Sequence, residues 1–237
     1  MRNAKFALVA ALSLGALGAL AVLPANAAQS SPAPATGTGG NLGAGVDSSA
    51  PAKLVQTAAS AMLKELDAHR ADYRANPGKV HGLVDQVLLP HFDTTYSARL
   101  VLGRHWRDAN DDQRKRFVDA FYRSLLNNYG DALVDFTADK LQVLPYNGDP
   151  KADNATVKTK VRKSDGSSVE VDYALHKTDD GWKAWDVIIE GISYVRSFRE
   201  DFDSEIEQKG IDEVITRLQS GETPQAIKHT TTTLKKS

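Results

Sequence analysis

Few residues in this 237-residue sequence have the types and spacings that catalysis or metal binding requires. No two histidines have the H-x-x-x-H or H-E-x-x-H spacing of a helical metal site; they are His69, His81, His91, His105, His176 and His229. Cysteine is absent, which excludes disulfides, thiolate metal sites and cysteine nucleophiles. The sequence therefore predicts no metal site and no other cofactor.

Two acidic residues and one serine are the remaining candidates for catalysis. Asp186 and Glu190 lie near the end of a predicted strand, and a pair of carboxylates could act as general acid and base. Gly191-Ile192-Ser193 resembles the start of a G-x-S-x-G nucleophile turn, but the second glycine is missing. The strand pattern places Asp186 away from the apolar side, as a solvated or paired carboxylate. The sequence therefore does not predict an enzyme.

Apolar side chains form a more informative pattern. In the helix expected over 112–135 they recur every four residues, the spacing of one helix face: Phe117, Phe121, Leu125 and Tyr129. In the predicted strands they alternate with polar residues and give the sheet one apolar face: Val157, Val161, Val171, Tyr173, Trp185, Val187 and Ile189. These two faces fit either a closed core or the lining of a hydrophobic site, and spacing alone does not distinguish the two.

The elements that carry these faces begin with helices. A helical pattern starts near Pro51 and ends at Asn76-Pro77-Gly78, and a short helix precedes Pro90. Asp93 can cap a third helix, and Asn110 with Gln113 form a capping box before the long fourth one.

The pattern then changes to the two-residue period of strands. About four antiparallel strands are expected, and two helices follow them; the strands are 141–144, 156–162, 169–176 and 182–189, and the helices are 194–208 and 212–219. Turns at 164–166 and 179–181 separate the later strands. The sequence therefore predicts an α+β domain, with several helices over one face of a curved antiparallel sheet.

The ends of the chain differ in composition from the middle. Residues 1–28 combine Arg2 and Lys5, an apolar run and an Ala25-Asn26-Ala27 site, as in a cleaved signal peptide. Residues 29–50 are rich in Gly, Ser, Ala and Pro and are expected to form a flexible linker. We expect the folded domain at 51–222 and a frayed tail at 223–237.

The charge is nearly balanced, with 29 Lys and Arg against 30 Asp and Glu, so nothing indicates nucleic acid as a partner. Basic residues nevertheless gather before and within the long helix and after the last strand: Arg104, Arg107, Arg114, Arg116, Arg196 and Arg199. They fit ordinary pairing with nearby acids, such as Asp108, Asp111 and Asp112, or a surface that docks a partner or contacts phosphate.

Four blocks of the sequence resemble one protein family. Leu102-Gly103-Arg104-His105-Trp106-Arg107, followed by Gln113, Arg114, Phe117 and Phe121, fits the pattern L-G-x-x-W-[RK]…Q-[RQ]-x-x-F-x-x-x-F of the MlaC-type periplasmic phospholipid-binding proteins. The stretch 182–193 (WKAWDVIIEGIS), continued by Arg199 and Phe202, is the second block. The other two are 89–93 (LPHFD) and Gly210-Ile211-Asp212 with Leu218. The resemblance covers roughly 52–220, although the linker is longer than expected.

The resemblance implies a monomeric periplasmic carrier that holds the acyl chains of a glycerophospholipid between helices and sheet. It also implies two partners, an outer-membrane lipoprotein–porin complex and an inner-membrane ABC transporter with MCE domains, and a role in outer-membrane lipid asymmetry. On this interpretation the apolar residues named above line the lipid site, and the arginines dock partners. Two alternatives stay open: a periplasmic adaptor with a closed core and no ligand, and a small curved-sheet enzyme.

Overall fold

The computed structural model describes residues 42–221, except 77, 135, 136, 138, 139, 150 and 163–165. The predicted signal peptide, the linker up to residue 41, most of the turn at 164–166 and the tail at 223–237 therefore lie outside the described residues. So do the side chains of Tyr129, Asp131 and Ala132. The described residues belong to one compact unit.

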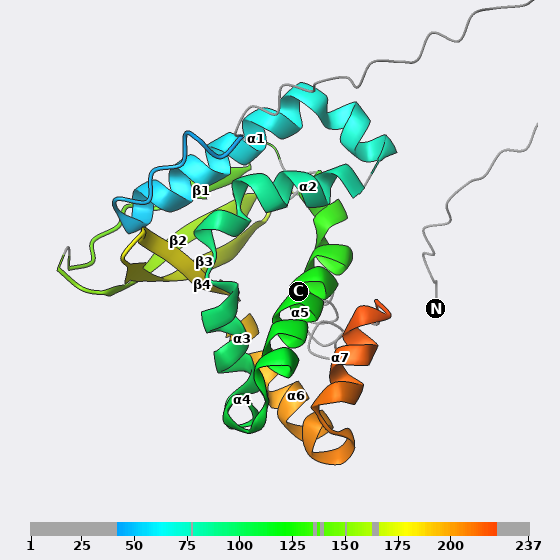
Figure 1. Cartoon of the computed structure of the whole chain (residues 1–237). Helices are drawn as coiled ribbons and strands as arrows, with labels where there is room; N and C mark the ends of the chain where they lie inside the picture. Colours follow the sequence, from blue (N-terminus) through cyan, green and yellow to red (C-terminus); the bar gives the residue numbers. More distant parts are fainter. Residues whose placement is uncertain are drawn as a thin grey trace, which may run out of the picture. The chain divides into compact units, whose positions relative to one another are not determined.

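Helices occupy the first half of this unit (Figure 1). They are α1 (Pro51–Ala75), α2 (Gly78–Val87), the short 3-10 helix η1 (Leu89–His91), α3 (Thr94–Leu102), α4 (His105–Asp108) and α5 (Asp111–Leu133). The starts of two of them follow from side-chain caps. The Asp93 carboxylate accepts the backbone N–H of Tyr96 at 2.8 Å, and Asn110 and Gln113 bond each other's backbone N–H reciprocally. Both predicted caps are confirmed.

The second half forms a five-stranded antiparallel sheet in the order β1-β2-β3-β4-β5, followed by two helices. The strands are β1 (Leu141–Val143), β2 (Asn154–Arg162), β3 (Ser168–Thr178), β4 (Gly181–Ile189) and β5 (Ile192–Ser193), and the helices are α6 (Tyr194–Lys209) and α7 (Ile211–Gln219). The predicted α+β class is confirmed. The fifth strand, which is two residues long, is the element that period-two alternation did not predict.

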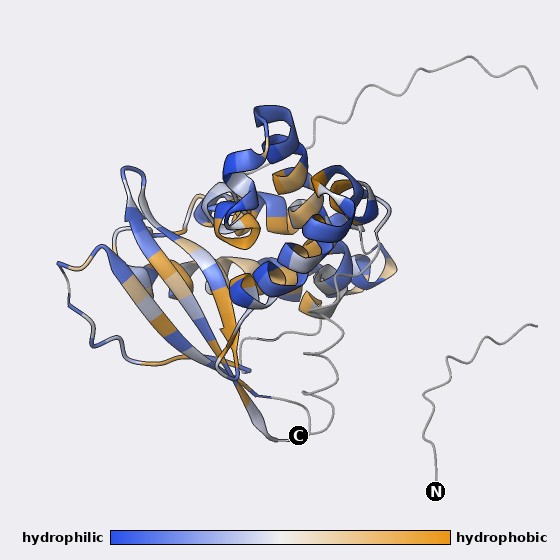
Figure 2. Ribbon diagram, turned by 90° about the horizontal axis from the view of Figure 1, so that it is seen from below, coloured by the Kyte–Doolittle hydropathy of each residue, from blue (hydrophilic) through white to orange (hydrophobic). Residues whose placement is uncertain are grey.

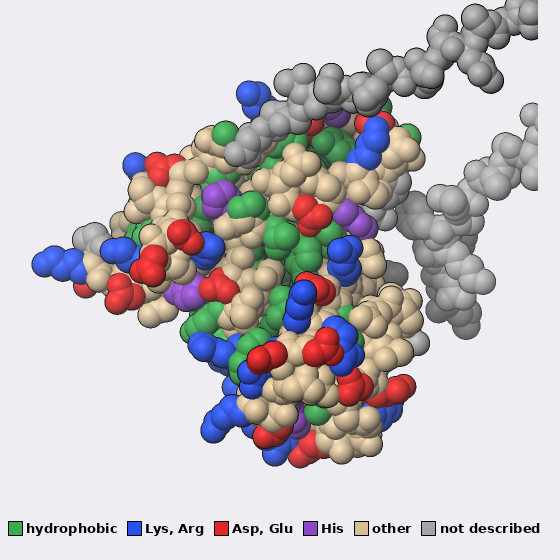
Figure 3. Space-filling model, in the orientation of Figure 1, with side chains coloured by type: hydrophobic (Ala, Val, Ile, Leu, Met, Phe, Trp, Pro, Cys, Tyr) green, Lys and Arg blue, Asp and Glu red, His purple; other side chains and the backbone are tan. Residues whose placement is uncertain are grey.

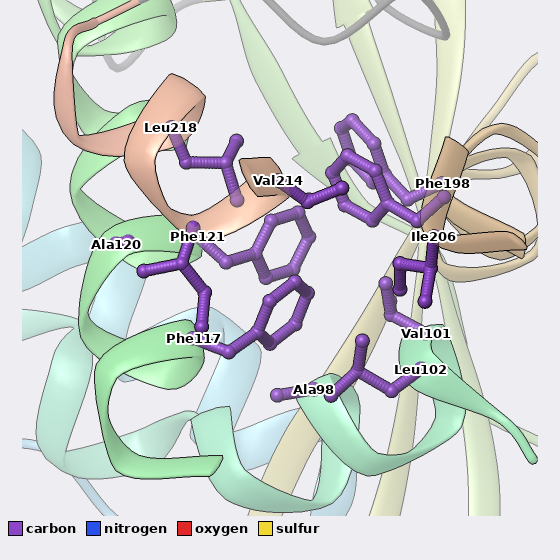
Figure 4. Packing of buried hydrophobic residues seen from close by; sticks show 12 residues of the cluster. Ala98, Val101, Leu102, Phe117, Ala120, Phe121, Phe198, Ile206, Val214 and Leu218 are labelled. Carbon is purple, nitrogen blue, oxygen red and sulfur yellow. The ribbon is translucent and has the colours of Figure 1, made fainter. Parts of the chain in front are cut away.

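Three clusters of buried side chains hold the described elements together. The helical cluster joins α3, α5, α6 and α7, and its aromatic and aliphatic side chains converge in Figure 4. The second cluster joins α1, α2 and α5 around Leu66, Leu83 and Val87. The third, here called the sheet cluster, packs Leu54 and Val55 of α1 against Val157, Leu175 and Trp182. Each cluster removes apolar area from water, the main stabilising contribution to folding.

Residues 42–50 lie in the predicted linker and contact the domain. The carbonyl of Ser48 accepts the backbone N–H of Trp182 at 2.9 Å, and Val46 packs against the sheet cluster. The backbone N–H of Asp47 donates to the Thr57 hydroxyl at 2.8 Å. These bonds join the last residues before α1 to the β3–β4 hairpin and to α1 itself.

Candidate functional site

The strand register places apolar residues of three strands on one face of the sheet. Val157 is opposite Tyr173, and Tyr173 is opposite Val187. In the next row on that face, Thr159 is opposite Val171, which is opposite Ile189. Directly opposed residues share a face, and every second residue along a strand returns to it. We define the sheet patch as five apolar residues of this face that are only partly buried: Val161, Val171, Tyr173, Val187 and Ile189.

Helix α1 covers only part of this apolar face. Val157 is fully buried in the sheet cluster, where Leu54 and Val55 of α1 pack. The residues of the sheet patch are only partly buried, and all of them except Tyr173 lie outside the three clusters of described residues. Orange and blue residues alternate along the strands in Figure 2, as expected for a sheet with one apolar face. Apolar surface therefore continues beyond the area that α1 covers.

Tyr173 lies at the border between the sheet cluster and the rest of the patch. It packs against the cluster while part of its surface stays accessible. Burial raises the pKa of its phenol, because the surrounding protein disfavours the charged form.

Trp185 does not fit the simple alternation that the sequence predicted. Ala174 pairs with Asp186 and Leu175 with Ala184, so Trp185 is the additional residue of a β-bulge. Its ring lies edge-on to Tyr96 of α3, with centroids 5.6 Å apart. The indole N–H is buried and has no hydrogen-bond partner among the described residues. The bulge therefore directs Trp185 toward α3, and no pairing places it on the face of Val187 and Ile189.

The predicted helical residues are not grouped with the sheet patch. Phe117 and Phe121 are buried in the helical cluster, where Phe121 lies edge-on to Phe198 with centroids 5.0 Å apart (Figure 4). Leu125 is partly buried against the same cluster, and the side chain of Tyr129 lies outside the described residues. The predicted apolar face of α5 is present, but its first two residues, Phe117 and Phe121, pack against α6 and α7 rather than the sheet.

The six predicted docking arginines fall into two groups. Arg104 pairs with Asp203 and Glu207, Arg114 stacks on Trp106 and pairs with Asp111, and Arg116 bridges Asp112 and Asp212. These three therefore have partners within the chain. The other three, Arg107, Arg196 and Arg199, are exposed and have no ion-pair partner within the described part of the chain. In Figure 3, acidic and basic side chains are interspersed over the region of α4 to α7.

A surface recess of about 480 Å³ lies where α6 passes the end of α3. Charged side chains line it: Arg104, Arg196, Arg199, Glu200 and Asp203. Arg199 lies directly against Gly103, whose φ of 55° is unfavourable for other residues, and a Cβ there would lie 2.9 Å from the guanidinium Nε. Because its lining is charged, this recess does not suit an apolar ligand.

Two of the catalytic candidates, Asp186 and Ser193, form hydrogen bonds that connect β4, β5 and α6. Asp186 is buried, and its carboxylate accepts the Ser193 hydroxyl at 2.5 Å and the backbone N–H of Val195 at 3.0 Å. The Ser193 oxygen in turn accepts the N–H of Arg196 and caps α6. Burial raises the pKa of Asp186, although these hydrogen bonds act in the opposite direction. Asp186 is thus a paired carboxylate, as predicted, but a buried one.

Glu190 does not form an acid–base pair with Asp186. Its carboxylate accepts the backbone N–H of Glu170 at 2.6 Å, and its own N–H donates to the Glu170 carbonyl at 3.0 Å. These bonds hold the turn between β4 and β5 against β3. Within the described residues, no three His, Asp or Glu side chains are grouped as a metal site would require.

Comparison with known proteins assigns the family. The model of the MlaC protein family matches residues 56–220. The toluene tolerance protein ttg2D of Pseudomonas putida is 29% identical over 163 residues, 68% of this chain and 75% of that protein. The intermembrane phospholipid transport system binding protein MlaC of Haemophilus influenzae is 24% identical over 174 residues, 71% of this chain and 80% of that protein.

A solved structure agrees with these matches. The phospholipid-binding protein from Ralstonia solanacearum, in complex with a phospholipid, is similar with a TM-score of 0.66 and 26% sequence identity. The similarity covers 70% of this chain and 93% of that one. Since the family model spans well over half of the sequence, this chain belongs to the MlaC protein family.

Proposed function

We propose that this chain binds a glycerophospholipid and carries it in the periplasm as part of an intermembrane lipid transport system. The observation that carries the proposal is the sheet patch, an apolar surface that the described helices leave partly accessible. Similarity to a structure that contains a phospholipid supports it. We propose that the acyl chains lie against Val161, Val171, Tyr173, Val187 and Ile189, with Leu125 and Tyr129 of α5 as further candidates.

The size of the hydrophobic effect explains why such a carrier needs an apolar surface. Each buried CH₂ group contributes about 0.8 kcal/mol, so two chains of roughly 16 carbons contribute on the order of 25 kcal/mol. Release into open water is therefore prohibitively slow, and lipid exchange requires contact with a membrane or a partner protein. Because a passive carrier binds in both directions, its partners determine the direction of transport.

The proposed partners follow from the family and from the proposed periplasmic location. We propose that residues 1–28 direct export and are removed, and that residues 29–41 of the predicted linker serve as a spacer. The proposed partners are the outer-membrane lipoprotein–porin complex and the inner-membrane ABC transporter with MCE domains. Of the six predicted docking arginines, we retain Arg107, Arg196 and Arg199, because the structure gives them no acidic partner among the described residues.

Substitution of Val187 by glutamate tests the lipid site. The side chain is partly exposed, so the change should leave the protein folded, whereas a carboxylate beside the acyl chains should abolish loading. Lipid extracted from the purified variant is compared with that from Thr156→Glu, which adds the same charge on an exposed position of the opposite sheet face. Normal loading in a folded Val187→Glu variant would contradict the assignment of this face.

A further inference from the structure

The apolar surface of the sheet patch continues as far as β5, the edge strand of the sheet. Ile189 of β4 is opposite Ile192 of β5, so Ile192 extends the row that begins with Thr159, Val171 and Ile189. Opposed residues in an antiparallel pair share a face, which places Ile192 on the apolar face of the sheet. The row therefore crosses four strands on one side of the sheet.

Exposure increases along this row. Thr159 is fully buried, Val171 and Ile189 are partly buried, and Ile192 is 37% exposed. Ile192 is the one exposed large hydrophobic residue in the described part of the chain. A single exposed isoleucine is ordinary on a protein surface. Here, however, Ile192 is the outer end of a row whose other partly exposed members, Val171 and Ile189, are also apolar.

The turn before Ile192 is held in a defined conformation. Glu190 and Gly191 both have positive φ, 50° and 78°, as in the tight turns that match the twist of paired strands. Glu190 is the one non-glycine residue with positive φ among those described, and its two hydrogen bonds to Glu170 fix it against β3. On the other side, the Ser193–Asp186 bond at 2.5 Å fixes the start of α6. Ile192 thus lies between two residues, Glu190 and Ser193, that hydrogen bonds hold in place.

β5 is also the last strand of the sheet order, so no described strand covers its outer edge. An apolar ligand that lies against Val171 and Ile189 can reach solvent across Ile192 without crossing a charged side chain of this row. We propose that the β4–β5 hairpin is the edge over which the acyl chains pass when a phospholipid enters or leaves, with Ile192 as the residue that they contact there. This inference rests on the proposed function and adds to it the path by which lipid enters and leaves.

The role assigned to Ile192 concerns rate and not affinity. A carboxylate at this position raises the free energy of an acyl chain in passage, because methylene groups would displace water from the charge. On this proposal, lipid that is already bound lies against Val171 and Ile189 and not against residue 192. Uptake and release should therefore slow by the same factor, which leaves the equilibrium amount of bound lipid unchanged.

The test measures transfer of a pyrene-labelled phosphatidylethanolamine between the chain from residue 29 onward and vesicles of phosphatidylethanolamine and phosphatidylglycerol. Ile192→Asp is compared with wild type, with Ile192→Val, and with Thr156→Asp as the charge control on the opposite sheet face. We expect Ile192→Asp to transfer lipid at least about tenfold more slowly, or about 1.4 kcal/mol in the barrier, with unchanged lipid content at equilibrium. The other two variants should transfer lipid at the wild-type rate.

Two results would overturn the inference. An unchanged transfer rate in Ile192→Asp would show that lipid passes elsewhere. A lower equilibrium lipid content would show that Ile192 contacts the bound lipid and does not mark its passage. If wild type itself takes up no lipid, the proposed function fails first, which the wild-type control shows before any variant is compared. Circular dichroism and thermal unfolding of each variant confirm that the fold is retained.

Discussion

Several residues of the sequence blocks that resemble the family hold the helices of this protein together. Gly103 permits close contact with Arg199, and Trp106 stacks under Arg114 with the guanidinium 5.4 Å from the ring centre. Gln113 donates to Asp212 at 2.8 Å, which joins the start of α5 to α7. The residues by which the family is recognised therefore connect helices, and the sheet patch that we propose for lipid consists of ordinary aliphatic residues.

The buried carboxylate of Asp186 gives a prediction about pH. Its native pKa is raised from the ordinary value of 3.8, so the folded chain holds this proton to higher pH than the unfolded chain does. The free energy of unfolding should therefore fall as the pH rises from about 3.8 through the raised native pKa, and this contribution should be constant above it. Asp186→Asn removes the titrating group and with it this slope.

Urea unfolding of wild type and Asp186→Asn between about pH 4 and about pH 7 checks this prediction. The stability of the variant relative to wild type should improve as the pH rises, whatever the cost of replacing one of the two acceptor oxygens, which bond Ser193 and Val195, by an amide NH₂. A difference that is independent of pH would contradict a raised pKa for this carboxyl.

Among the secondary-structure elements, α5 depends on its capping box. Asn110→Ala removes the side-chain oxygen that accepts the N–H of Gln113 at 2.9 Å. We expect a loss of about 1 kcal/mol in the free energy of unfolding, the usual cost of an N-cap substitution. Asn127→Ala, at an exposed position in the interior of the same helix, is the matched control and should leave stability unchanged or slightly raised. Equal losses in the two variants would show that the cap contributes nothing specific.

The sequence predicted these elements well because their signals are local. Asp93, Asn110 and the break at 76–78 mark helix ends through backbone bonding, and alternation marks the strands. What each face packs against is not local. Periodicity showed that Phe117 and Phe121 are buried, yet their partners Phe198 and Phe202 are some 80 residues away in the sequence. The bulge at Trp185 and the pairing of Ile192 with Ile189 depend on strand register, which alternation within one strand does not determine.

At the scale of the whole molecule, no helix in the described part of the chain has the length and hydropathy to span a bilayer. The central question is whether the apolar sheet face is complementary to a lipid or is closed in solution. The sequence could not answer it, because the same alternation of Val171 and Tyr173 suits a packed core and a ligand site. The partial burial of the sheet patch outside the three clusters is the structural observation that favours the ligand site.

Lipid mass spectrometry on organic extracts of the purified chain from residue 29 onward, prepared without detergent, tests the central claim most directly. The account predicts diacyl glycerophospholipid in a near-stoichiometric amount, because chains bound with so large a transfer free energy stay with the protein during purification. A folded protein that yields no phospholipid, and takes up none when it is added, would contradict the account. The sheet patch would then be closed in solution, and the chain would be an adaptor with the family's fold.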